Sequence, residues 1–270
     1  MHASTLARMQ VRVLGNVEVV VDDSVVDLGG LKQRALFAVL VAADGRAVSV
    51  ERLIDLLWGD EPPAKVMTSL QAYVANLRRL LEPGRPPRQP ARILVTRPPG
   101  YALLLADEYL DARRFVELIA EADDTKDDPV RAETMLEEAL GLWRGEAYSG
   151  VSTTSTALGA EAARLEEMRL HALERLWASR LGRGESARSV GELERLVALH
   201  PLREQCWRLL ALALYRSGRQ GDALAALHRA RSYLAEELGI DPGAELRELE
   251  VAVLRPVSYT HLTLPTIYSV

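Results

Sequence analysis

The hydrophobic pattern of the chain changes near Asp107, and this change limits the possible folds more than any other feature. Before Asp107, short runs of alternating apolar and polar residues lie among stretches with helical periodicity. After it the strand signals stop, and one helical pattern follows another as far as Leu254. The 270 residues are enough for two domains, and 48% of them are hydrophobic, which can supply two cores. The sequence therefore predicts an α+β first domain followed by an all-α second domain.

The first part is predicted to hold a small antiparallel sheet, three helices and a hairpin. The sheet consists of the β-branched runs "QVRVL", "VEVVV" and "SVVDL", which Gly15-Asn16 and Asp22-Asp23 separate as turns. Helical periodicity begins at Leu31 and stops at Asp44-Gly45, and it returns at Val50–Trp58 and at residues 65–82. A short "AVSV" run precedes the second helix. Two apolar strands within "RILVTRPPGYALLL" then flank a proline-containing turn.

The second part is predicted to be a series of amphipathic helices. They cover residues 111–123, 129–143, 157–181, 185–200, 202–217, 220–238 and 243–254. The segment "GRGESARSVGEL" resembles "GRQGDALAALHR", with a spacing of 36 positions (182 to 218). Tetratricopeptide arrays, which are built from helical hairpins, repeat about every 34 residues. The pattern therefore indicates a tetratricopeptide-like helical repeat domain.

Charge is distributed unevenly along the chain. The whole chain carries −5, which argues against a general polyanion binder, but residues 1–105 carry +3 and residues 106–256 carry −8. Between residues 65 and 97, Glu82 is the only acidic residue, and it stands against Lys65, Arg78, Arg79, Arg85, Arg88, Arg92 and Arg97. A basic module is therefore joined to an acidic one.

Metal, cofactor and membrane sites are not expected. The five His and the single Cys206 form no CxxC, no HExxH and no cluster with metal-ligand spacing, so we predict no zinc site, disulfide framework or cofactor. The first residues lack the apolar region of a secretory signal, and no apolar run approaches the length of a membrane span. The expected location is the cytoplasm, without a membrane partner.

The helix predicted over residues 65–82 has two contrasting faces. At about 100° per residue, one arc is apolar and holds Val66, Leu70, Tyr73, Val74, Leu77 and Leu81. The opposite arc holds Thr68, Gln71, Ala72, Ala75 and Arg79, and Asn76 and Arg78 lie on its flanks. A helix that enters a DNA major groove needs small residues where its backbone approaches the bases, together with side chains that hydrogen-bond or neutralise phosphate. The alternative is a solvated face on which alanine simply favours helix.

The order of the elements favours DNA binding. Strands, a helix, a short strand, a helix, a turn, a basic helix and a final hairpin form the sequence of a winged helix-turn-helix. The motifs "LIDLLWGDEPP", "LQAYVANLRRLL" and "VTRPPGYAL" resemble the OmpR/PhoB-type winged-helix domain. This resemblance implies that residues 70–81 lie in the recognition helix and that Arg97 belongs to the wing. Trp58 is predicted to pack between helices and not to stack on a base.

These considerations define the predicted DNA contacts. They are Thr68, Gln71, Ala72, Ala75, Asn76, Arg78, Arg79 and Arg97. For the arginines, base readout and phosphate contact are both open.

The second half carries a wider resemblance. Motifs such as "ALGLWRGEAYSGV", "HPLREQCWRLLALALYRSGRQGDALAALHRAR" and "LAEELGIDPGAELRELE" are similar to the bacterial transcriptional activator domain. The whole arrangement resembles a Streptomyces antibiotic regulatory protein. That resemblance implies an activator that binds direct repeats near the -35 region, as a dimer on double-stranded DNA. It also implies recruitment of RNA polymerase holoenzyme, through its sigma factor or its alpha and beta subunits, to antibiotic biosynthetic promoters, and hence association with the nucleoid.

The predicted boundaries follow from this resemblance. Residues 1–106 form the winged-helix domain, residues 107–256 the activator domain, and residues 257–270 an uncharged tail of non-native or disordered character. The chain has no GxxxxGK[ST] motif of the kind expected for an added nucleotide-binding ATPase region, so it is either a small member of the family or a truncated one.

Two other functions remain open at this point. The helical repeats could serve an adaptor or ligand-sensing protein in which the winged helix is structural. An enzyme would need a nucleophile with a base, or a phosphate loop, and neither is visible. Cys206 lies among leucines and is interpreted as a small buried hydrophobe.

Overall fold

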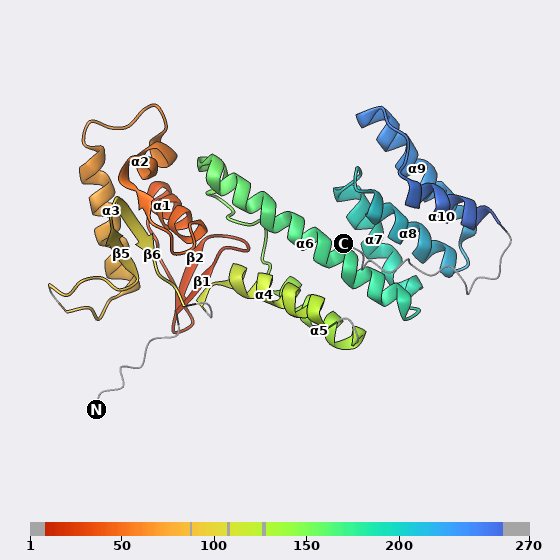
Figure 1. The fold of residues 1–270 in the computed structure, drawn as a ribbon, viewed down its shortest axis with the longest axis horizontal. Coiled ribbons are helices and arrows are strands. Elements are labelled where there is room, and N and C mark those ends of the chain that lie inside the picture. The colour runs from red at the N-terminus through yellow and green to blue at the C-terminus, as the bar shows by residue number, and fades with distance from the viewer. Residues whose placement is uncertain (1–8, 87, 107–108, 126–127, 256–270) are drawn as a thin grey trace. The chain divides into compact units, whose positions relative to one another are not determined.

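A computed structural model of the protein describes residues 9–86, 88–106, 109–125 and 128–255 (Figure 1). The chain divides into two compact units, Met1–Arg169 and Leu170–Val270, and the border falls within helix α6 (Thr156–Gly182). The predicted tail, residues 257–270, lies outside the described residues. Over the described ranges, no helix is both long and apolar enough to cross a membrane.

The first unit opens with the predicted antiparallel sheet, in the order β1-β2-β3. Its strands are β1 (Met9–Arg12), β2 (Glu18–Val21) and β3 (Ser24–Val26). Asp22 and Asp23 both have positive φ, 46° and 62°, and Val21 pairs with Ser24 across them. This is the geometry of a two-residue type I′ turn, which matches the right-handed twist of the strands it joins. The predicted turn at Asp22-Asp23 is confirmed.

The rest of the winged helix follows in the predicted order. Its elements are α1 (Leu31–Ala42), β4 (Val48–Ser49), α2 (Val50–Trp58), α3 (Val66–Leu81), β5 (Leu94–Arg97) and β6 (Gly100–Leu103). The second sheet has the order β4-β6-β5, so the hairpin of β5 and β6 pairs with β4. Only glycine fits at position 100, because a Cβ there would lie 1.9 Å from the carbonyl oxygen of Val48.

Residues from beyond the predicted domain boundary hydrogen-bond to the segment that follows β1. The N–H groups of Arg144, Tyr148 and Ser149 donate to the carbonyls of Leu14, Val13 and Gly15 at 2.8, 2.8 and 2.9 Å. Helix α4 (Asp111–Asp124) begins beside the same segment, and α5 (Pro129–Gly141) follows it. The backbone that continues from β1 therefore finds its partners in residues of the second predicted domain.

Asp111 anchors this junction. Its carboxylate accepts hydrogen bonds from the N–H groups of Val13 (2.9 Å) and Leu14 (3.2 Å) and forms an ion pair with Arg144. The Asp111 side chain is only 8% exposed. The first compact unit thus continues past residue 106. The predicted boundary between residues 106 and 107, which divides the chain into two sequence families and not into compact units, stays a prediction.

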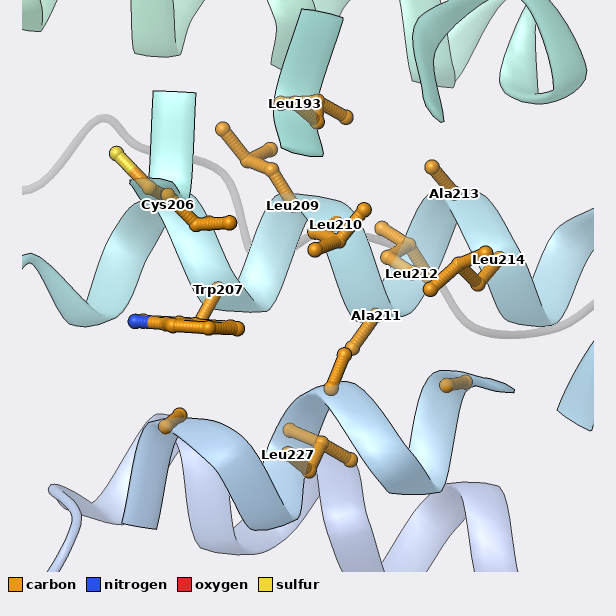
Figure 2. Packing of buried hydrophobic residues seen from close by; sticks show 14 of the residues in the cluster. Leu193, Cys206, Trp207, Leu209, Leu210, Ala211, Leu212, Ala213, Leu214 and Leu227 are labelled. Atoms are coloured by element: carbon orange, nitrogen blue, oxygen red, sulfur yellow. The ribbon is translucent and has the colours of Figure 1, made fainter. Parts of the chain in front are cut away.

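The second unit contains helices and no strand among its described residues. It contains the end of α6 and then α7 (Ser186–Leu199), α8 (Glu204–Arg216), α9 (Gln220–Leu238) and α10 (Ala244–Leu254). Helix α8 lies at its centre: Leu209 is turned toward Leu193 of α7, while Trp207 and Ala211 face Leu227 of α9 (Figure 2). A helix buried on all sides needs apolar residues all round, which explains the run "CWRLLALALY".

The helical repeat has a different register from the one predicted. Gly184 and Gly218, which precede α7 and α9, both have positive φ (89° and 77°) and stand 34 positions apart (184 to 218). Counted in this register, Leu193 corresponds to Leu227, and both are buried. The predicted alignment paired Gly182 with Gly218, but Gly182 is still part of α6. The repeat therefore has the period typical of a tetratricopeptide hairpin.

Replacing Asp111 with alanine tests the junction. We expect Asp111→Ala to lower the free energy of unfolding by about 2–4 kcal/mol, because two backbone N–H groups lose their acceptor and Arg144 loses its partner. Asp128→Ala is the matched control. Asp128 is exposed and caps only α5, so its loss should cost about 1 kcal/mol. Urea denaturation measures both values, and equal losses would show that Asp111 is an ordinary helix-end carboxylate.

Candidate nucleic-acid interface

Burial of one stripe fixes the rotation of α3. Leu70, Val74 and Leu77 are at most 2% exposed. The predicted outward arc is exposed along its whole length and comprises Thr68, Gln71, Ala72, Ala75 and Arg79. Asn76 and Arg78 are half-buried on its flanks, as predicted. The five residues of the outward arc therefore lie together on one accessible face, with Asn76 and Arg78 at its edges, and the role of all seven as DNA contacts stays a prediction.

An aromatic pair joins α3 to α2. Ser49 caps α2 by accepting a hydrogen bond from the Arg52 N–H at 3.1 Å. At the other end of α2, the ring of Trp58 lies nearly parallel to that of Tyr73 in α3, with centroids 6.2 Å apart. Trp58 thus packs between helices, in keeping with its predicted role.

Arg78 links α3 to the wing. Its Nε donates to the carbonyl of Leu94 at 2.9 Å, and its Nη2 donates to the Thr96 hydroxyl at 2.8 Å, both in β5. The guanidinium carbon also lies 5.8 Å from the centre of the Tyr101 ring in β6, within the range of a cation–π contact. Arg78 therefore holds α3 and both strands of the hairpin together, a role that its sequence position did not reveal.

Arg79 is held by a different chain of contacts. Its Nη2 donates to Oδ1 of Asn76 at 2.8 Å, and Nδ2 of Asn76 donates to Oε1 of Gln33 at 3.3 Å. Gln33 is a residue of α1 that is only 7% exposed, and sequence reasoning missed it. A signal was present, because Gln33 stands at helical spacing from the buried Leu36, Phe37 and Leu40. A polar residue on a buried stripe needs a polar partner.

The electrostatics of the region favour an anion. The Glu82 carboxylate, which stands alone against seven basic residues, is 12% exposed and accepts a hydrogen bond from the Arg92 N–H at 2.9 Å. Arg97 is exposed at the end of β5, and no side-chain partner for it is found among the described residues. The outward side of α3 and the wing tip therefore carry unneutralised positive charge.

Neither a metal-binding cluster nor a reactive cysteine is found among the described residues. Within the described ranges, no group of three His, Cys, Asp or Glu residues could hold a metal ion. Burial, reinforced by the nearby Glu174 carboxylate, raises the pKa of the Cys206 thiol to about 12, so the thiol stays protonated and unreactive. Cys206 is a fully buried part of the second core, as predicted.

Comparison with known proteins identifies both halves of the chain. Residues 110–254 match the family described as "Bacterial transcriptional activator domain", and residues 24–103 match "Transcriptional regulatory protein, C terminal". The chain is 36% identical to the regulatory protein DnrI of Streptomyces peucetius over 252 residues, which are 92% of each protein. It is 40% identical over 247 residues to the transcriptional regulator RedD of Streptomyces coelicolor, covering 91% of this chain and 70% of RedD. The chain belongs to the Streptomyces antibiotic regulatory protein family.

Longer relatives share the same two domains. The chain is 40% identical to AfsR of Streptomyces coelicolor over 246 residues, which are 90% of this chain but 24% of AfsR. A solved structure of Mycobacterium tuberculosis EmbR in complex with a low affinity phosphopeptide matches the fold with a TM-score of 0.86 and 34% identity, over 94% of this chain and 67% of that one. The family consists of transcriptional activators and not of enzymes, and the winged helix with its helical repeat domain is confirmed.

Substitutions of Arg78 test how much its link to the wing contributes to stability. Arg78→Ala should lower the free energy of unfolding by about 1–3 kcal/mol, because Leu94 and Thr96 lose their donors. Arg78→Lys should be nearly as destabilising, because an ammonium cannot reproduce the two-pronged geometry of a guanidinium. Arg79→Lys is the control, with a change within about 0.5 kcal/mol. If Arg78→Lys unfolds like the wild type in urea, the link to the wing contributes little to stability.

Proposed function

We propose that this chain is a sequence-specific DNA-binding activator that binds direct repeats near the -35 region and recruits RNA polymerase to antibiotic biosynthetic promoters. The observation that carries the proposal is the exposed face of α3, where Ala72 and Ala75 lie among Gln71, Thr68 and Arg79. Small side chains let a helix backbone approach the base edges, while amide, hydroxyl and guanidinium groups supply the hydrogen bonds that read them.

The wing supports the same proposal. Arg97 follows directly after Thr96, which Arg78 ties to α3, so the wing tip is fixed relative to the helix that would enter the major groove. An exposed arginine at a wing tip suits the narrow minor groove, whose negative potential attracts cations. The proposed contacts therefore comprise base readout by the first turns of α3 and a second, mainly electrostatic contact by Arg97.

Activation is assigned to the helical half. Residues 106–256 carry −8 and repel DNA, so their surfaces suit a protein partner such as RNA polymerase holoenzyme. Direct repeats would place two copies on the DNA in the same orientation, which makes the protein a dimer on its site. The proposal locates the protein at the chromosome. Because the chain spans about a quarter of the length of AfsR, the proposal is restricted to the activity of the two domains described above.

Footprinting on a promoter with candidate direct repeats tests the whole proposal. The repeats should be protected, protection should extend toward the -35 region when RNA polymerase is added, and transcription in vitro should rise. A promoter with scrambled repeats and the same base composition is the control. Equal binding to both promoters would contradict sequence-specific recognition, whereas protection without increased transcription would contradict recruitment.

Ala75→Glu tests the close approach of α3 to DNA. The substitution places an anion on the proposed contact face while changing helix propensity little, so DNA binding should fall by about 100-fold or more with the fold intact. Ala225→Glu, on an exposed position of α9, adds the same charge elsewhere and should leave binding within about twofold. Fluorescence anisotropy gives the affinities and circular dichroism the helix content. Unchanged affinity of a folded Ala75→Glu protein would remove this face from the interface.

A further inference from the structure

A line of hydrogen bonds runs from a buried backbone carbonyl to an arginine on the outward face of α3. We infer that Gln33, which is 7% exposed and belongs to α1, is a positioning residue for DNA recognition: it orients Asn76 and, through Asn76, Arg79. The inference rests on the proposed function, since it assigns a role within the same interface. Asn76 and Arg79 were predicted DNA contacts; Gln33 was not.

The polarity of the line is set at its buried end. The carbonyl of Leu28 can only accept, and Gln33 Nε2 donates to it at 2.9 Å. Gln33 must therefore turn its Oε1 toward Asn76. The reverse orientation would place two oxygens against each other and leave a buried carbonyl without a donor, which is unfavourable. One backbone carbonyl thus selects one of the two orientations of the Gln33 amide.

The same logic fixes Asn76. Because Gln33 offers an acceptor, Asn76 must direct Nδ2 inward, at 3.3 Å, and its Oδ1 outward. The outward oxygen needs a donor, and Nη2 of Arg79, one turn further along α3, supplies it at 2.8 Å. Reversing the Asn76 amide would break both bonds. The orientation of a buried glutamine is therefore passed to the exposed guanidinium.

The loop before α1 keeps Gln33 in place. Gly29 has φ +80°, and a Cβ there would lie 3.1 Å from Gln33 Nε2, so the loop backbone passes closely over the amide. The Gly29 N–H is itself bound by Asp27 Oδ1 at 2.8 Å. Gln33 is thus confined by the loop on one side and Asn76 on the other, with little freedom to rotate.

Restricting the Arg79 side chain before DNA binds should reduce the conformational entropy that is lost on binding. A free arginine side chain populates many rotamers, and part of this freedom is lost when it contacts DNA. Arg79 has already given up some of this freedom, and its remaining N–H groups stay available on the exposed face. These hydrogen bonds should therefore strengthen binding to a DNA sequence that contacts Arg79 in this orientation more than they strengthen binding to DNA in general.

A double-mutant cycle tests the inference. Gln33→Met keeps the side-chain length and helix propensity but removes both hydrogen bonds, and it is combined with Arg79→Ala. The probes are a duplex selected by the wild-type protein from a random-sequence library and a scrambled duplex of the same length. Arg79→Ala should weaken binding to the selected duplex about 10-fold, and Gln33→Met about 3- to 10-fold. The double variant should be no weaker than Arg79→Ala alone, and Gln33→Met should change binding to the scrambled duplex less than about twofold.

Each outcome has a distinct meaning. Additive losses in the cycle, or equal losses on both duplexes, would overturn the positioning role of Gln33. The proposed DNA-binding function would not be affected by that result. If the wild-type protein enriches no duplex from the library, the proposed function fails and the inference fails with it. Circular dichroism and urea denaturation establish that the variants are folded.

A second pair of measurements does not depend on the Gln33 variant. Asn76→Ala removes the middle of the line at a half-buried position, and its cycle with Arg79→Ala should also be non-additive. In the DNA-free wild-type protein, the Asn76 side-chain amide protons should exchange slowly with water, as hydrogen-bonded amides do. Additive losses, or exchange as fast as that of the exposed Gln71 amide, would overturn the inference.

Discussion

The candidate interface depends on the burial of a single stripe of α3. Leu70, Val74 and Leu77 are inserted into the first core, and a helix with three points of its surface buried cannot rotate about its axis. Everything on the opposite arc is thereby directed outward: the two alanines, Gln71 and Arg79. The hydrogen bonds of Arg78 and Asn76 then adjust what the stripe has already fixed, because they join α3 to the wing and to α1. Apolar packing determines which residues of α3 point outward, and the hydrogen bonds determine how α3 is joined to its neighbours.

Elements governed by local chemistry could be predicted from the sequence. Two adjacent aspartates between β-branched runs predicted a turn, and both adopt the positive φ that a type I′ turn needs. The helix α9 has the predicted bounds, and the exposed face of α3 contains each residue assigned to it. The helical repeat was recognised but aligned two positions out, because similarity of letters favoured Gly182, whereas the turn itself is made at Gly184. The register of the helical repeat is therefore defined by the shared backbone conformation of Gly184 and Gly218, and not by matching residue types in the sequence.

What could not be predicted involves partners distant in sequence. Asp111 reads as the first residue of a helix, and only the fold brings it to the backbone of Val13 and Leu14, more than 90 positions earlier. Likewise, the role of Arg78 depends on Leu94 and Thr96, whose positions follow from how the hairpin packs. Periodicity reports which side of an element is buried, but it does not report which polar atoms meet across two elements.

The neighbouring arginines of "NLRRLL" show why the same residue type can serve two purposes. They differ by about 100° around the helix axis, which is enough to turn Arg78 toward the wing and Arg79 toward the open face. Arg78 uses its guanidinium internally, where planar, two-pronged bonding matters more than charge. Arg79 is held by one bond and keeps its other donors free of described protein partners. Because lysine can supply charge but not the planar fork, replacing each arginine in turn should affect stability at position 78 and recognition at position 79. The wing therefore holds α3 through Arg78, and the buried Gln33 holds Asn76 and, through it, Arg79, so that both sets of contacts meet within one turn of α3.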